Sequence, residues 1–417
     1  MSKKNKNNSG FIWLLVLAVI FVIISLAVGP KIFAVSYDKD SGRPIQEENS
    51  EEDTEVVKEV SSHIALPNAV KAIYMTSCVV GTKDFRAKLV ALAEETEVNA
   101  IVIDIKDFSG TLSFAPKSDR LKPAWDAAQC GTSDMKEFIA ELHEKGIFVI
   151  GRITVFQDPF YTKLHPEDAV KRASDGAVWK DHKGLSFVEV GAKRYWDYIL
   201  ELSHESYEIG FDELNFDYVR FPSDGNMKDI YFPFSNEIIV ANGTKGKQIA
   251  LEEFFKFLDK ELRGDLPADT SKRPIISADL FGMTTTNTDD LNIGQVLERS
   301  LPYFDYIAPM VYPSHYPNTF NGWANPNHYP YELIHFVMGE GVRRVEEFKN
   351  ASTTPEHIRP KIHKEQLRTW IQDFDYGGDY GPTEVREQIQ ATYDVGLTSW
   401  MIWAPSNIYT RGALLNE

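Results

Sequence analysis

Two aspartates lie near the ends of short apolar segments that are typical of buried β-strands. Asp217 belongs to the segment ELNFDYV and Asp279 to the segment IISADLF. Side chains alternate along a strand, so we expect Asp217 to share a face with Asn215 and Val219, with Tyr218 on the opposite face. Neighbouring parallel strands lie about 4.8 Å apart, which would bring the two carboxyl groups near the separation of about 5–5.5 Å found in retaining glycosidases. Such a pair is suited to the hydrolysis of a glycosidic bond.

Further charged residues accompany this pair at the ends of other apolar segments. Arg152 lies within FVIGRITV, and Arg220 follows Asp217 by three residues. A neighbouring guanidinium lowers the pKa of a carboxyl group, so either arginine could keep Asp217 ionised. Burial of Arg152 without a carboxylate partner would be costly, whereas Arg220 is equally compatible with a surface salt bridge. Asp104 and Asp107 end the segment VNAIVIDIKD and could hold sugar hydroxyls or serve as the proton donor instead.

Aromatic and polar side chains at the remaining strand ends extend the candidate site. The loop 312–331 is rich in Tyr, Phe and Trp among Pro, Asn and Gly. Sugar rings stack their flat C–H faces on aromatic surfaces, so this loop could line a sugar subsite, although it could also simply pack on the rim of the domain. The candidate substrate-binding residues of this group are Tyr312, His315, Trp323, Gln372 and Trp403.

Eight short, β-branched apolar segments alternate with helix-length segments beyond Pro67. This alternation is typical of parallel βαβ units, and eight of them predict a (β/α)8 barrel with its chemistry at the C-terminal ends of the strands. An open doubly wound sheet is the alternative, but no G-x-G-x-x-G or Walker A motif is present, so we expect no nucleotide cofactor. The predicted strands are 70–75, 98–105, 148–155, 213–219, 275–281, 306–312, 367–374 and 399–404.

The composition of the 417-residue chain excludes several classes of protein. Its 44 basic and 61 acidic residues give a net charge of −17, which repels the phosphates of nucleic acid, so we expect no nucleic-acid partner. None of the ten histidines forms an H-x-x-x-H pair, and we expect no metal site. Cys78 and Cys130 are the two cysteines. Two unpaired thiols are the favoured interpretation, although one disulfide bond between them is also compatible with the sequence.

The N-terminal part of the chain predicts a membrane anchor. Its uncharged apolar run is close to the roughly 20 residues that a spanning helix needs, and the lysines before it favour a cytoplasmic N-terminus. We therefore expect a single-pass membrane protein whose domain lies outside the cell on a flexible acidic linker. Cleavage after residues 34–36, which would release the domain, is the alternative. The predicted parts are a cytoplasmic tail (1–10), a transmembrane anchor (11–29), a linker (30–66) and a barrel domain (67–417).

Seven segments together resemble a family of bacterial glycoside hydrolases that share membrane-anchored or secreted (β/α)8 barrels. The stretch FDYVRFP is the most specific part of the resemblance. The resemblance implies a barrel domain that acts on an extracellular or cell-envelope polysaccharide, without specifying the sugar. The matching segments are VNAIVIDIKDFSG (98–110), GIFVIGRITVFQD (146–158), GFDELNFDYVRFPSDG (210–225), IISADLFG (275–282), YIAPMVYPSHY (306–316), RTWIQDF (368–374) and SWMIWAPSN (399–407).

Two more distant likenesses bear on the catalytic residues. Chitinase-type barrels carry D-G-x-D-x-D-x-E on strand four, and the corresponding alignment puts Val219 where their catalytic glutamate stands. That chemistry is therefore not carried over. The layout also resembles amylase-type barrels, which have the nucleophilic Asp on strand four and the proton donor on strand five. This likeness implies that Asp217 is the nucleophile and Asp279 the acid/base.

Two other functions remain compatible with the sequence. A metal-dependent polysaccharide deacetylase also uses aspartates and histidines in an extracellular barrel, but it needs clustered ligands. A carbohydrate-binding envelope protein could keep the groove without turnover, and the missing chitinase glutamate leaves that alternative open.

Overall fold

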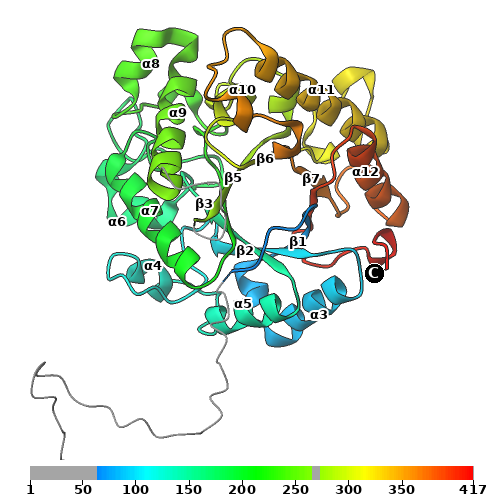
Figure 1. The fold of residues 1–417 in the computed structure, drawn as a ribbon. Coiled ribbons are helices and arrows are strands. Elements are labelled where there is room, and N and C mark those ends of the chain that lie inside the picture. The colour runs from blue at the N-terminus through cyan, green and yellow to red at the C-terminus, as the bar shows by residue number, and fades with distance from the viewer. Residues whose placement is uncertain (1–62, 265–272, 417) are drawn as a thin grey trace, which may run out of the picture. The chain divides into compact units, whose positions relative to one another are not determined.

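Eight parallel strands close into a barrel in chain order, and β8 returns to pair with β1 (Figure 1). The computed structural model describes residues 63–264 and 273–416. The predicted (β/α)8 barrel is confirmed, and each predicted segment coincides with one strand, although β2 extends one residue beyond its segment. The strands are β1 (Lys71–Met75), β2 (Ala100–Lys106), β3 (Phe148–Thr154), β4 (Glu213–Asp217), β5 (Ile275–Phe281), β6 (Tyr306–Met310), β7 (Thr369–Gln372) and β8 (Trp400–Trp403).

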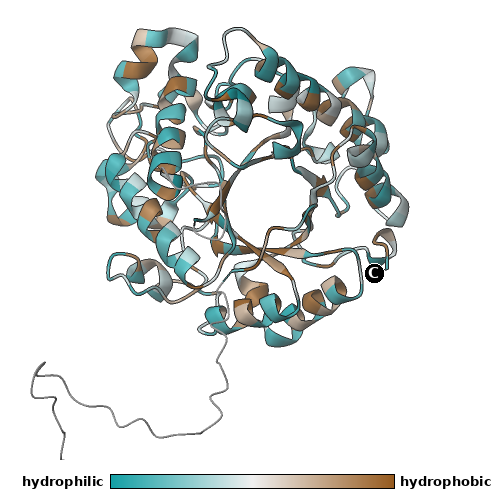
Figure 2. Cartoon of the chain, viewed as in Figure 1, coloured by the Kyte–Doolittle hydropathy of each residue, from teal (hydrophilic) through white to brown (hydrophobic). Residues whose placement is uncertain are grey.

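Helices surround the barrel and cover the outer face of its strands (Figure 1). In α5, for example, the buried residues Met135, Phe138, Ile139 and Leu142 recur at the spacing of one helix face. Figure 2 shows the strands as mostly hydrophobic and the helices as mixed, as expected of a layer with one face in water. The helices are α2 (Ser77–Val80), α3 (Lys83–Glu94), α4 (Lys122–Asp126), α5 (Met135–Glu144), α6 (Pro159–Leu164), α7 (Lys193–Glu208), α8 (Asn236–Asn242), α9 (Gly246–Leu258), α10 (Leu297–Ser300), α11 (Pro330–Asn350) and α12 (Pro382–Asp394).

The end of β4 differs from the prediction. Strand pairing stops at Asp217, because Tyr218 adopts a positive φ of 52° that is incompatible with an extended strand. The alternation of side chains is therefore broken at this point. Val219 packs in the core between strands and helices instead of sharing a face with Asp217, and Tyr218 lines a cavity at the barrel mouth. The expected faces of Val219 and Tyr218 were wrong for this reason.

The interior of the barrel contains a polar network below its mouth. Glu213 Oε1 accepts hydrogen bonds from Arg368 Nη1 at 2.7 Å and from Ser277 Oγ at 2.6 Å, and all three side chains are buried. Phe216 of β4 lies opposite Ala278 of β5 in the strand register. The next pair of positions along the two strands is Asp217 and Asp279, so the register brings these carboxyl groups to the same height.

The described chain begins with a short segment that contacts the barrel. The backbone N–H of Ile64 donates to Asp212 Oδ1 at 2.9 Å, and the Ile64 and Leu66 side chains pack against the interior cluster. Residues 63–66 were predicted to belong to the linker, but these contacts attach them to the domain. No helix within residues 63–264 and 273–416 is long and apolar enough to cross a membrane. The predicted tail and anchor, residues 1–29, lie outside the described residues.

Cys78 and Cys130 form a disulfide bond with a Cα–Cα distance of 4.5 Å. Cys78 lies in α2, directly after β1, and Cys130 precedes α5. The favoured expectation of two unpaired thiols was therefore wrong. The two cysteines are 52 residues apart in the sequence, and this separation does not predict their distance in space. They come together because β1 and β2 are neighbouring strands of the barrel.

Candidate active site

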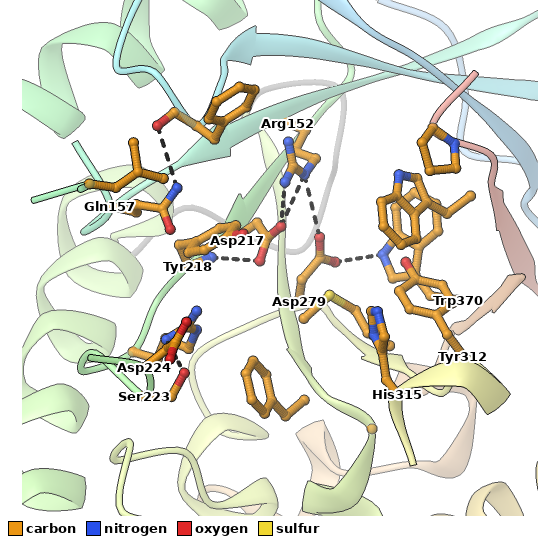
Figure 3. A pocket seen from close by; sticks show the side chains of 18 of the residues that line it. Arg152, Gln157, Asp217, Tyr218, Ser223, Asp224, Asp279, Tyr312, His315 and Trp370 are labelled. Carbon is orange, nitrogen blue, oxygen red and sulfur yellow. Dashed lines mark hydrogen bonds and ion pairs between the residues drawn. The ribbon is translucent and has the colours of Figure 1, made fainter. Parts of the chain in front are cut away.

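A cavity of about 790 Å³ opens where the C-terminal ends of the strands meet (Figure 3). This is the end of the barrel at which enzymes of this architecture place their chemistry. Most of the candidate residues predicted from the sequence line it: Asp104, Arg152, Asp217, Arg220, Asp279, Tyr312, His315 and Trp403.

Arg152 of β3 lies within 4.0 Å of three carboxyl groups in this cavity, and Figure 3 shows its contacts with two of them, Asp217 and Asp279. Its Nη2 and Nε donate to Asp217 Oδ2 at 2.5 and 3.1 Å, and its Nη1 donates to Asp104 Oδ1 at 2.7 Å. Its Nε also lies 4.0 Å from Asp279 Oδ2. These carboxylates raise the pKa of Arg152 against the effect of burial, which acts in the opposite direction and is the largest single influence. The arginine therefore stays charged and orients Asp217.

The carboxyl groups of Asp217 and Asp279 lie close enough to act on one bond. Arg152 Nε is 3.1 Å from Asp217 Oδ2 and 4.0 Å from Asp279 Oδ2, so these two oxygens are separated by at most the sum of the two distances, about 7.1 Å. Retaining glycosidases have carboxyl groups about 5–5.5 Å apart, and inverting ones about 6.5–9.5 Å apart. The upper limit includes the retaining distance and excludes most of the inverting range.

Asp279 is held as a neutral acid. Its side chain is 1% exposed, and its Oδ1 accepts hydrogen bonds from Trp370 Nε1 at 2.8 Å and Asn215 Nδ2 at 2.9 Å. Burial, together with the neighbouring charge of Asp217, raises the pKa of Asp279 to about 8. Because two N–H donors already occupy Oδ1, the proton of the neutral acid belongs on Oδ2. This oxygen is the one that faces Arg152 and Asp217.

Asp217 has the surroundings of a carboxylate. Besides the two donors of Arg152, the backbone N–H of Tyr218 donates to its Oδ1 at 2.5 Å. This N–H lies at the point where the chain turns out of the strand, since Tyr218 has a positive φ of 52°. A guanidinium and a backbone N–H stabilise negative charge on a carboxyl group. The two neighbouring carboxyl groups thus have different surroundings: Asp217 accepts from a guanidinium and a backbone N–H, whereas Asp279 is buried and has a raised pKa.

Asp104 lies on the far side of Arg152 from Asp217. Its Oδ2 accepts the hydroxyl proton of Tyr74 at 2.5 Å, and its Oδ1 accepts from Arg152. Burial raises the pKa of Asp104. Both oxygens are thus engaged by protein donors, which leaves this side chain less suited to proton donation than Asp279, whose Oδ2 has no close donor.

Aromatic rings form one wall of the cavity. The Tyr312 ring lies 4.8 Å from Trp403 and 5.1 Å from His315, measured between ring centroids. Burial lowers the pKa of His315, so this imidazole is neutral near pH 7. Trp370 adds a further ring and an N–H donor beside Asp279. Such a wall offers flat surfaces against which a pyranose can stack.

Three predicted site residues do not line the cavity. Asp107 Oδ1 accepts from the N–H and the hydroxyl of Ser109 in a local turn, and its Oδ2 accepts from Ser77. Gln372 is fully buried, where its side-chain carbonyl accepts the backbone N–H of Ser314. Trp323 stacks on Tyr329 at 5.7 Å in the loop after β6, away from the cavity lining. The structure therefore does not bring these three residues into the cavity lining, contrary to the expectation from the sequence.

Several cavity residues were missed by the sequence analysis. Trp370 and Tyr74 both occupy inward-facing strand positions and contact the acids, as described above. Strand parity could have identified Trp370, because it shares a face with the predicted residue Gln372. Gln157 follows the third predicted strand, a position at which a polar side chain is expected to reach the barrel mouth, whereas no sequence signal identifies Asp181 or Tyr218, because their positions depend on loop conformation. Among the described residues, no group of three or more His, Cys, Asp or Glu side chains is arranged to hold a metal ion.

The chain matches a known protein family. A family model described as a putative glycosyl hydrolase domain matches residues 72–409, which include every cavity residue named above. No curated protein matches the chain.

Three solved structures are similar to this chain, and two of them have a TM-score of at least 0.50. The glycoside hydrolase domain of PgaB (BpsB) from Bordetella bronchiseptica is 12% identical over 83% of this chain and 99% of its own, with a TM-score of 0.57. The catalytic domain of β-amylase from Paenibacillus polymyxa is 11% identical over 84% and 95% of the two chains, with a TM-score of 0.50. A hypothetical protein from Ruminiclostridium thermocellum is 30% identical over 50% of this chain and 96% of its own, with a TM-score of 0.41. At 11–12% identity, the first two likenesses show the fold alone.

Proposed function

This chain belongs to the family of putative glycosyl hydrolase domains, and from that premise we propose that it hydrolyses glycosidic bonds of an extracellular or cell-envelope polysaccharide with Asp217 and Asp279. One observation carries the proposal: the carboxyl group of Asp279, buried with a raised pKa, and that of Asp217, bound to a guanidinium, have their Oδ2 atoms within about 7.1 Å of each other in an open cavity. Hydrolysis of a glycosidic bond needs a proton donor and a carboxylate side by side.

The first step of the proposed reaction forms a glycosyl-enzyme intermediate. Asp279 transfers the proton on Oδ2 to the glycosidic oxygen while a carboxylate oxygen of Asp217 attacks the anomeric carbon. The bond between that carbon and the leaving oxygen breaks, and the shortened sugar chain departs as an alcohol. Arg152 holds the Asp217 carboxylate in position through two N–H donors.

The second step releases the sugar. Asp279, now a carboxylate, accepts a proton from water as the water oxygen attacks the anomeric carbon and the bond to Asp217 breaks. Two displacements at the same carbon retain the anomeric configuration. The burial that raises the pKa of Asp279 assists its return to the neutral acid. The reaction needs no group beyond water and these side chains.

Product analysis tests this proposal. Full-length protein in detergent is incubated with cell-wall and capsular polysaccharide fractions, and released reducing ends and their anomeric configuration are followed by NMR. We expect a product of retained configuration from the wild type and a loss of at least about 10³-fold in Asp217→Asn and Asp279→Asn. Asp126→Asn is the matched control, because Asp126 is exposed at the end of α4 and forms no hydrogen bond with any described residue.

Other outcomes would replace the proposal. Binding of glycan with no released sugar would indicate a carbohydrate-binding envelope protein. Chelator-sensitive release of acetate would indicate a deacetylase. A product of inverted configuration would keep the hydrolase but replace the covalent intermediate with attack by water.

We also propose that residues 11–29 anchor the protein in the membrane, with the domain outside the cell. The apolar run and the preceding lysines support this location, and so does the Cys78–Cys130 disulfide, since such bonds persist in oxidising compartments. Protease added to intact cells should remove the domain. Protection of the domain from protease would contradict this orientation.

A further inference from the structure

Arg220 is a buried cation in the cavity that pairs with no carboxylate among the described residues. Its side chain belongs to a residue that is 9% exposed, yet it lines the cavity. The sequence analysis offered Arg220 as a partner of Asp217, but Arg152 takes that role. Burying a guanidinium without a carboxylate partner is costly, so this position requires an explanation.

The surroundings of Arg220 satisfy only part of its hydrogen-bonding capacity. Its Nη1 donates to the carbonyl oxygen of Phe221 and to Ser223 Oγ, both at 3.1 Å. Its Cζ lies 4.9 Å from the ring centroids of both Tyr218 and Phe281, where cation–π attraction partly offsets the cost of burial. Neither Nε nor Nη2 donates to any described residue. These two groups form the edge of the guanidinium that binds a carboxylate or phosphate through two parallel hydrogen bonds.

Arg220 lies close to the proposed point of cleavage. Arg220 follows Asp217 by three residues, and the Phe281 ring on which it lies belongs to the residue two positions after Asp279. Arg220 therefore lies near the ends of β4 and β5, close enough to Asp217 for that carboxyl group to influence its pKa. A sugar bound next to the scissile bond would come within reach of it.

Three other charged side chains of the neighbouring loops line the cavity, and two of them, Asp181 and Asp224, are close enough to Arg220 to raise its pKa against the effect of burial, which lowers it. Asp181 Oδ1 accepts the backbone N–H groups of Lys183 and Leu185 at 2.9 and 2.8 Å. Asp224 lies 3.5 Å from His182 Nε2 and is more than half exposed. Neither carboxylate forms an ion pair with Arg220, and Lys183 adds a second cation to the cavity lining. Both acids thus have partners other than Arg220.

We infer that the polysaccharide substrate is acidic, and that Arg220 binds a carboxylate or phosphate carried by the sugar next to the scissile bond. This inference rests on the proposed function of the site. The free Nε–Nη2 edge supplies the paired donors, and the aromatic rings of Tyr218 and Phe281 hold the guanidinium plane in place. A neutral sugar would leave this edge without an anionic partner.

Small sugars test the charge preference without requiring the natural polymer. Full-length protein in detergent is titrated with sodium glucuronate, glucose 6-phosphate and glucose at equal ionic strength, and its thermal midpoint and tryptophan fluorescence are recorded. We expect an anionic sugar to bind and to raise the midpoint more than glucose does. The response to glucuronate or to glucose 6-phosphate identifies the anion as a carboxylate or a phosphate.

Variants then locate the anion. Arg220→Gln should weaken binding of the anionic sugar by about 30-fold or more, the loss expected when one partner of a buried charged pair is removed. Arg220→Lys keeps the charge without the planar fork and should lose part of the affinity. Arg343→Gln is the control, because Arg343 is half-exposed on α11 and pairs with Glu340 and Glu347. The thermal midpoint of each unliganded variant shows whether it is folded.

A polymer assay separates this inference from the proposed function. An acidic polysaccharide and the same polymer with its uronic acids reduced to neutral sugars are compared with wild type and Arg220→Gln, using Asp217→Asn where binding alone is measured. If Arg220→Gln binds the carboxylated polymer more weakly than the wild type does, but binds the reduced polymer equally well, the inference is supported. This holds even if no polymer is cleaved, and in that case only the hydrolase proposal fails. Equal responses to glucose and to both anions, or an unchanged affinity in Arg220→Gln, would overturn the acidic substrate while leaving hydrolysis of neutral glycans intact.

Discussion

Replacement of Asp279 by Asn should abolish catalysis and, at the same time, stabilise the protein at neutral and alkaline pH. Asn is close in shape to the neutral acid, and its side-chain carbonyl can still accept from Trp370 Nε1 and Asn215 Nδ2. It cannot ionise, however, and it therefore avoids the cost of burying a charge beside Asp217. Active-site groups commonly trade stability for function in this way.

The size of this stabilisation follows from the pKa of Asp279. Its folded-state pKa of about 8 lies above its ordinary value of 3.8, so between these values the native state holds a proton that the unfolded state has lost. The free energy of unfolding must then fall as pH rises, by about 1.4 kcal/mol per pH unit until the folded-state pKa is passed. Between about pH 5.5 and pH 8 the wild type should lose roughly 3 kcal/mol relative to Asp279→Asn.

Urea denaturation of the full-length wild type and Asp279→Asn, followed by circular dichroism from pH 5.5 to 9, measures this difference. Comparison of the two proteins at each pH removes the contributions of all other titrating groups, and Asp126→Asn should run parallel to the wild type. A difference between wild type and Asp279→Asn that is constant with pH would refute the raised pKa and with it the assignment of Asp279 as the acid. The kcat/KM of the wild type should also decline above about pH 8, as the donor loses its proton.

Three further predictions concern the hydrogen-bond partners of the two aspartates and the disulfide bond. Trp370→Phe removes a hydrogen bond that lowers the pKa of Asp279, so the alkaline limb of the pH–rate profile should move upward, and an unchanged limb would argue against this contact. Arg152→Met leaves its buried carboxylate partners uncompensated and should reduce the free energy of unfolding by about 3–5 kcal/mol, measured in urea at pH 7. Substitution of Cys78 and Cys130 by Ser opens a 52-residue interval and should cost about 4 kcal/mol of stability under oxidising conditions, with no difference from the wild type under reducing conditions.

The sequence by itself determined the architecture. Most strands are short apolar runs that are buried on both faces, and eight such runs separated by helix-length segments favour a closed barrel. The alternation of side chains also put Asn215 and Asp217 on the inner face, because that rule depends only on backbone geometry. The expectation that Arg152 must find a carboxylate partner followed from the cost of burying its charge.

Only the tertiary structure decided how those elements meet. The turn at Tyr218 ended β4 early and moved Val219 into the outer core, since a single positive φ is not encoded by residue type alone. Asp107 was drawn into a local turn with Ser109, although its sequence position is equivalent to that of a cavity residue. Which hydrogen-bond donor a side chain such as Asp107 binds depends on the distances to all nearby donors, and the sequence does not give these distances.

The electrostatic properties of the site also depend on the assembled barrel. The raised pKa of Asp279 requires burial by residues from several strands and the charge of Asp217 on β4, and the orientation of Asp217 requires Arg152 from β3. Arg220 shows the same dependence, because its unpaired edge is visible only once every neighbouring carboxylate has been placed. Residue types fix which charges are available, whereas protonation and pairing depend on distances that arise only when distant segments come together.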